Sequence, residues 1–184
     1  MMRAARAYGL AAVAAVALTG LSVAPVAATN SAAPGAGLLA DCEVPAVPGH
    51  PVTVLLRDMP HQGMMGSNRG GMELLASPRT VPAGTVSLVA VNRGSRTHEL
   101  LVVPLAAGVR AGQQPVDAVG SIAEDGSLGE ASRTCGPSTG DGVAPRSAGW
   151  MTLTLRPGRY ELLCNLPGHY AAGMFGELDV AQGP

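Results

Sequence analysis

The chain has 184 residues, enough for one domain with a substantial core, and 47% of them are hydrophobic. Its charge is low: 12 Arg, with no Lys, stand against 13 acidic residues and give a formal net charge of −1. No basic stripe occurs along the sequence, which argues against nucleic acid as a partner.

The N-terminal 28 residues have the pattern of a secretory signal peptide. Arg3 and Arg6 precede an apolar run over 10–23, and small residues lead to a cleavage point after Ala28. Cleavage would leave 10 Arg against 13 acidic residues, a net charge of −3. The alternative is an uncleaved membrane anchor, although the run is short for a span. No later segment could cross a membrane, so we expect a periplasmic or extracellular protein. We also expect a monomer.

From residue 42 onward the sequence is typical of an all-β protein. Residues 29–41, rich in Ala, Gly, Ser and Pro, are expected to be a flexible leader before a domain over 42–182. Short β-forming runs then recur between Pro and Gly turn signals, which indicates a Greek-key β-sandwich. The expected strands are 52–56, 72–76, 85–91, 98–103, 150–155, 160–164 and 175–180. The turn at 156–159 predicts a tight hairpin.

One long stretch does not fit a minimal sandwich. Residues 106–148 are polar and rich in Gly, Ser and Pro, and a structureless loop of this length is unusual in a domain. We expect a loop-rich insertion here, with a short helix near 115–122.

A methionine-rich segment lies between the first two expected strands. Residues 59–72 include His61 and four Met, at 59, 64, 65 and 72, which together could bind Cu(I). Met also fills irregular gaps in cores, and the spacing matches no metal motif, so packing is the favoured interpretation.

The last loop of the chain places a thiol, an imidazole and a thioether within eleven residues. Cys164, His169 and Met174 are spaced C-x4-H-x4-M, and His98 is well placed to add a second imidazole. Two His, one Cys and a weak axial Met form the blue-copper electron-transfer set. Each residue alone is more often a core or solvated side chain. Strand alternation, however, puts His98, Cys164 and Met174 on the same faces as apolar neighbours, so they point into one interior.

This pattern resembles the cupredoxin family, most closely its rusticyanin and sulfocyanin branch. The resemblance implies one type 1 copper ion per chain and the transfer of single electrons between redox partners. It further implies that electrons pass through His169, where a redox protein would dock. The residues expected near that docking face are Leu166, Pro167, Tyr170 and Phe175, and the equally weighted alternative is an ordinary apolar loop packed on the domain.

The surroundings of the expected copper site lead to further predictions. The backbone N–H of Glu99 or Asn165 could donate to the Cys164 sulfur, and the amide of Asn92 or Asn165 could tie the two ligand loops together. If Cys164 binds copper, Cys42 and Cys135 remain, and in an oxidising compartment a disulfide between them is favoured over two free thiols.

Three functions are compatible with these features. The first is electron transfer, and the second is copper storage or delivery through segment 59–72. The third, a copper enzyme, needs additional His ligands, whereas the chain has only His50, His61, His98 and His169. We therefore expect an electron carrier and not an enzyme.

Overall fold

Buried and more exposed side chains alternate along strands of this protein. In β1 (His50–Asp58), the side chains of Val52, Val54 and Leu56 are buried, and the residues between them are more exposed. The computed structural model describes residues 42–58 and 71–183, which form ten strands. Residues 1–41, 59–70 and 184 lie outside this description, and with them the expected signal peptide, leader and most of the methionine-rich segment.

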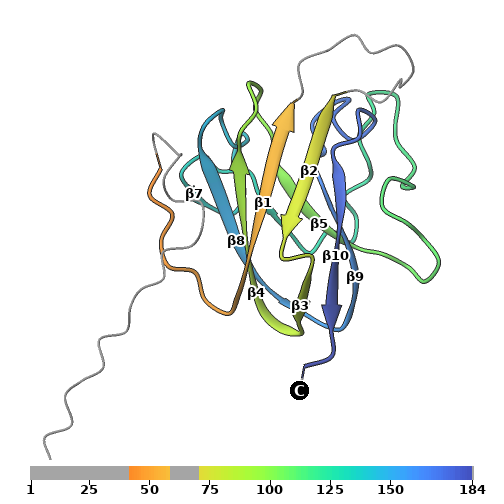
Figure 1. The fold of residues 1–184 in the computed structure, drawn as a ribbon. Helices are drawn as coiled ribbons and strands as arrows, with labels where there is room; N and C mark the ends of the chain where they lie inside the picture. Colours follow the sequence, from red (N-terminus) through yellow and green to blue (C-terminus); the bar gives the residue numbers. More distant parts are fainter. Residues whose placement is uncertain (1–41, 59–70, 184) are drawn as a thin grey trace, which may run out of the picture. The chain divides into compact units, whose positions relative to one another are not determined.

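Two mixed five-stranded sheets pack against each other (Figure 1). The first has the order β2-β1-β4-β8-β7, in which β2 is Met72–Ser77, β4 is Gly84–Asn92, β8 is Ala148–Leu155 and β7 is Gly136–Pro137. The second has the order β3-β10-β9-β5-β6, in which β3 is Thr80–Pro82, β10 is Phe175–Ala181, β9 is Gly158–Leu163, β5 is Leu100–Pro104 and β6 is Gly129–Ala131. The chain changes sheets five times, on entering β3, β4, β5, β7 and β9. The expected all-β sandwich is confirmed.

The main core lies between the two sheets. Leu56, Leu88 and Leu155 from the first sheet and Leu162 and Leu178 from the second are almost fully buried in it. No helix occurs in residues 42–58 and 71–183, and hence this part of the chain has none that could span a membrane.

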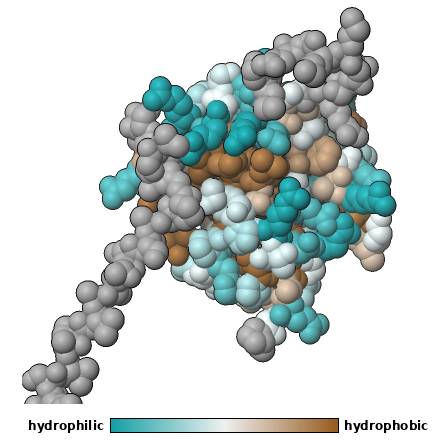
Figure 2. All heavy atoms as spheres, in the orientation of Figure 1, coloured by the Kyte–Doolittle hydropathy of each residue, from teal (hydrophilic) through white to brown (hydrophobic). Residues whose placement is uncertain are grey.

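The outer faces of both sheets are also covered. Val44 and Val47 of the N-terminal segment pack with Val89, Val91 and Trp150 on the first sheet. On the view of Figure 2, hydrophobic residues form a central band on this face between more hydrophilic ones. The loop-rich insertion over 106–148, the excursion, covers the second sheet: its Ile122 packs on Leu101, Leu163 and Tyr170. Two loop segments therefore give the sandwich apolar layers outside its main core.

The Cys42–Cys135 disulfide is present, with 5.2 Å between the two Cα atoms and a sequence separation of 93 residues. The backbone N–H of Cys135 donates to the carbonyl of Ala148, at the start of β8 (2.7 Å). The disulfide thus fastens the N-terminal segment to the edge of the first sheet.

Two local predictions are wrong. The turn at 156–159 does not close a hairpin, because β8 pairs with β4 and β7 whereas β9 pairs with β10 and β5. Leu155 and Tyr160 enter the same core from opposite sheets, and the Tyr160 hydroxyl donates to the carbonyl of Arg156 (2.7 Å). The expected helix near 115–122 is replaced by turns closed by a bridge between Val116 and Ile122.

Candidate metal centre

The side chains of Cys164 and His169, five residues apart in the sequence, converge with the distant His98 at one end of the sandwich. The Nδ1 atoms of His98 and His169 are 3.2 Å apart, and the Sγ atom of Cys164 lies 3.3 Å from the Nδ1 of His169. All three residues are buried, and their ligand atoms lie within 4.8 Å of one another. His98 is held by an isolated bridge to Val143, and Cys164 directly follows β9.

Met174 lies at the base of the same loop. Its backbone carbonyl accepts a hydrogen bond from the N–H of Cys164 (3.0 Å), and its N–H donates to the carbonyl of His169 (3.1 Å). Its side chain is fully buried in the main core together with that of Cys164. The role of Met174 as axial ligand stays a prediction.

The three converging atoms fit a single metal ion. Atoms bound to one first-row metal ion at about 2.0–2.3 Å lie about 3–4 Å apart, which matches the spacing of this group. One thiolate with two imidazoles is a soft set that suits copper better than calcium or magnesium. Among the described residues, no other group of three His, Cys, Asp or Glu side chains converges in this way.

Burial shifts the pKa values of these three side chains. It lowers the pKa of His98 and of His169, so both rings are neutral near pH 7 and each has a lone pair for a metal. Burial raises the pKa of Cys164 to about 12, against the opposing effect of the backbone N–H groups of Glu99 and Leu166. Cys164 is therefore a thiol in the metal-free protein and loses its proton when a metal binds.

The hydrogen bonds around the sulfur agree in part with the sequence-based expectations. The N–H of Glu99 donates to the Sγ of Cys164 (3.3 Å) as expected, whereas the N–H of Asn165 donates to the Glu99 carboxylate (2.9 Å). Burial, together with the nearby charges of Glu130 and Glu124, raises the pKa of Glu99 to about 7, although the N–H of Asn165 opposes this.

The side-chain amides of the two asparagines do not join the ligand loops. Asn92 donates to the carbonyls of Arg96 and Val143 and thereby fixes the loop before His98. The side chain of Asn165 instead bonds with the excursion: it accepts from the N–H of Ile122 (2.7 Å) and donates to Glu124 (2.8 Å).

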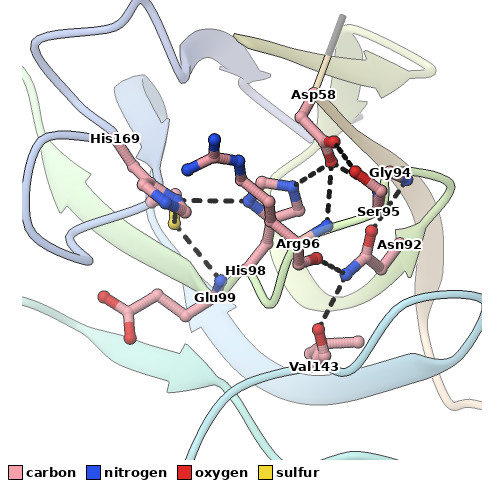
Figure 3. Close-up of polar contacts among 10 residues, drawn as sticks. Asp58, Asn92, Gly94, Ser95, Arg96, His98, Glu99, Val143 and His169 are labelled. Carbon is pink, nitrogen blue, oxygen red and sulfur yellow. Dashed lines mark hydrogen bonds and ion pairs between the residues drawn. The ribbon is translucent and has the colours of Figure 1, made fainter. Parts of the chain in front are cut away.

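Sequence reasoning missed Asp58, the last residue of β1. Its carboxylate contacts His98, Ser95 and Arg96 (Figure 3). Burial alone would raise the pKa of Asp58, but hydrogen bonds from Ser95, His98 and Arg96 outweigh it and hold the pKa far below its usual value. No sequence pattern links Asp58 to a residue 40 positions away, and only the parallel pairing of β1 with β4 brings the two together.

Glu161 was missed for a different reason. Alternation along β9 places it on the outer face, yet the excursion covers it completely. Its carboxylate accepts hydrogen bonds from the N–H of Gly112 (2.6 Å) and the hydroxyl of Tyr170 (2.9 Å). Tyr170 is buried and packs on Phe175, and a Cβ at Gly112 would lie 2.2 Å from the Phe175 ring.

The expected docking residues are therefore not all available to a partner. Tyr170 is buried, and Leu166 and Phe175 are only partly exposed, whereas Pro167 and Ala171 are exposed beside His169. His169 itself keeps 9% of its surface exposed, and His98 keeps none.

Comparison with known proteins gives structural matches only. Neither a family model nor a curated protein matches the chain. A structure of the copper protein rusticyanin is 23% identical over 72% of this chain and 79% of its own, with a TM-score of 0.44. A reduced auracyanin from Roseiflexus castenholzii is 22% identical over 72% of this chain and 99% of its own, with a TM-score of 0.42. The chain is thus similar to solved structures of rusticyanin and of auracyanin.

Proposed function

We propose that this protein is an exported type 1 copper protein that carries single electrons between redox partners. His98, Cys164 and His169 would hold one copper ion, with Met174 as a weak axial ligand. The observation that supports this most directly is the buried convergence of two imidazole Nδ1 atoms and one sulfur at 3.2 and 3.3 Å. Bound copper would supply a one-electron couple between Cu(II) and Cu(I).

The residues around the ligands favour a site that holds its ion. Backbone hydrogen bonds fix His98 to Val143 and Cys164 to Met174, so the ligand positions depend on the sandwich itself. A cage of this kind changes little when an electron arrives or leaves, which suits a carrier. His169 is the most exposed of the three converging residues, and we expect electrons to pass at its ring edge.

A partner would dock beside His169. The exposed residues there, Pro167 and Ala171, carry no charge, and transient redox complexes need only small interfaces. Val116 and Val119 of the excursion are 46% and 58% exposed, and a Cβ at Gly120 would lie 3.2 Å from the Cα of Gly168. The excursion therefore adds apolar area next to the ligand loop.

Catalysis by a second copper site finds little support. His50 begins β1 and Asp58, beside His98, ends it, which separates them by about 26 Å along the strand at roughly 3.3 Å per residue. Among the described residues, His50 is thus too far away to join His98 and His169.

Copper storage or delivery is the second candidate. Asp58, beside His98, and Met72 are paired residues of β1 and β2, so the described residues on either side of residues 59–70 lie together near the candidate metal centre. The ligands of such a second site, Met59, His61, Met64 and Met65, lie outside the described residues.

Copper addition to the mature protein tests the proposed site. We expect one bound equivalent and an intense thiolate-to-copper absorption band that is lost in Cys164→Ser. Thr85→Ala, which alters an exposed residue at the start of β4, should keep the band. No visible band in the wild-type protein, or a band that survives Cys164→Ser, would contradict the proposal.

Copper stoichiometry separates carrier from delivery protein. If the protein is a carrier, joint replacement of Met59, His61, Met64 and Met65 should leave one equivalent bound and electron-transfer rates unchanged. A second Cu(I) equivalent under reducing conditions, lost in this variant, would favour delivery instead.

A further inference from the structure

A carboxylate lies directly behind one of the converging histidines. The ring of His98 presents its Nδ1 to His169 and its Nε2 to the Oδ1 of Asp58, at 3.2 Å and 3.1 Å (Figure 3). The two nitrogens therefore face opposite surroundings. One lies in the candidate metal centre, and the other lies against a carboxylate.

Asp58 is held in place independently of His98. Its Oδ1 also accepts the N–H groups of Ser95 (2.6 Å) and Arg96 (3.2 Å), and its Oδ2 accepts the Ser95 hydroxyl. A Cβ at Gly94 would lie 1.7 Å from the Oδ1, so only glycine lets the loop close around this carboxylate. The side chain of Asp58 is 13% exposed, and that of His98 is fully buried.

This arrangement selects one form of the His98 ring. A carboxylate that accepts hydrogen bonds at both oxygens has no proton to give, so the shared proton lies on the Nε2 of His98. The Nδ1 of the neutral ring then carries the lone pair and points at the other ligands. The ring is prepared for a metal before any metal arrives.

We infer that Asp58 is a positioning residue for the metal centre, which fixes the ring of His98 and tunes the reduction potential through the Asp58–His98 hydrogen bond. The predicted effect of Asp58 on the reduction potential rests on the proposed function, whereas its effect on the His98 ring does not. A carboxylate partner makes a ligating imidazole more basic and holds its orientation. A more basic ligand and a nearby negative charge both favour Cu(II) over Cu(I), and so lower the potential.

The mutational test compares Asp58→Asn with Ser95→Ala. The first removes the charge but keeps the shape, and the second removes one anchor of Asp58 without touching His98. Loss of such a partner weakens metal binding by about 10–100-fold. If this loss falls on Cu(II), Asp58→Asn should raise the midpoint potential by about 59–118 mV, at 59 mV per tenfold change. Ser95→Ala should leave the potential near that of the wild type.

A second measurement needs neither copper nor a variant. In the metal-free wild-type protein, ¹⁵N NMR of the His98 ring should show the proton on Nε2. A proton on Nδ1 would overturn the inference, even if Asp58→Asn fails to fold. Equal potentials in Asp58→Asn and the wild type would overturn it, as would an equal shift in Ser95→Ala, since Asp58 would then only anchor the loop. A wild-type protein that lacks the thiolate-to-copper band but has the Nε2 proton would contradict the proposed function and support the role of Asp58 on the ring.

Discussion

A different backbone contact holds each of the three converging residues in place. His98 exchanges two hydrogen bonds with Val143, at 3.1 and 2.7 Å, and Cys164 donates to the carbonyl of Met174. His169 donates through its N–H to the carbonyl of Leu166, within a turn that the left-handed Gly168 completes. Main-chain pairing thus brings the side chains together without requiring a metal.

Substitution of Met174 tests the axial position. A thioether binds Cu(II) weakly, so Met174→Leu should keep the visible band and raise the reduction potential, whereas Met174→Gln should lower it because a harder oxygen ligand favours Cu(II). Each tenfold change in relative affinity for the two oxidation states corresponds to about 59 mV. The measurement is redox titration of both variants. An unchanged potential in both would mean that another group is axial, with Met151 or Met65 as the next candidates.

At the scale of single elements, the disulfide is the first test. It closes a loop of 93 residues and holds the segment whose Val44 and Val47 cover the outer face of the first sheet. A loop of this length contributes about 4–5 kcal/mol in the chain-entropy model, and often less in practice. Joint Cys42→Ser and Cys135→Ser substitution should therefore lower the free energy of unfolding by about 2–5 kcal/mol in denaturant titrations.

The copper band should survive this double substitution, because both cysteines lie against the carbonyl of Ala148 and belong to a different group from His98, Cys164 and His169. Hydrogen exchange should show faster exchange in 42–49 and little change in β9. Equal stability of the variant and the wild type would show that the N-terminal segment holds without its covalent link.

A salt bridge fastens the excursion and carries a pH dependence. Arg159 binds both carboxylate oxygens of Glu177, at 2.5 and 2.6 Å, and the carbonyl of Val109 at 2.9 Å. Hydrogen bonding to Arg159 lowers the pKa of Glu177 from its ordinary 4.5. The pair therefore stabilises the protein above about pH 4.5, and this contribution is lost as the pH falls through the lower pKa of the folded state.

Glu177→Gln should remove this part of the acid dependence and lower the free energy of unfolding at neutral pH only slightly, because the pair is partly exposed. Unfolding titrations between pH 3 and pH 7 measure both effects. Glu73→Gln, which breaks the longer exposed pair with Arg57 (3.8 Å), should change stability less. If the free energy of unfolding falls equally steeply with decreasing pH in Glu177→Gln and the wild type, the pair does not cause this pH dependence.

The same elements show what the sequence could and could not predict. Alternating strands such as β1 and β10, and the ligand spacing after Cys164, depend on local patterns, and these are readable without a structure. The hairpin at 156–159 failed because a short turn does not reveal whether the next strand stays in its sheet. Asp58 and the burial of Glu161 depend on contacts across 40 or more residues, which leave no local trace.

At the scale of the whole molecule, metal binding should add to stability. The three converging ligand atoms are buried and organised in the native state, so copper should bind it in preference to the unfolded chain. At free copper 1,000-fold above the dissociation constant, the gain is about 4 kcal/mol. Thermal unfolding should thus occur several degrees higher with copper and return to the metal-free value after chelation. Cys164→Ser should show almost none of this difference, and equal melting temperatures of the loaded and metal-free wild type would exclude preferential binding to the native state.

The anchoring of the ligand loop by the excursion has a consequence for loop grafting. Asn165 bonds with Ile122 and Glu124, and the Tyr170 hydroxyl accepts the N–H of Gln114 (3.0 Å) while it donates to Glu161. The eleven residues 164–174 therefore depend on contacts with residues outside the loop. Transferred alone into another sandwich, they would bring the ligands but leave behind the segment that braces them. A working transplant would have to carry 109–124 as well, so that in this chain the loop and the excursion form a single unit of exchange.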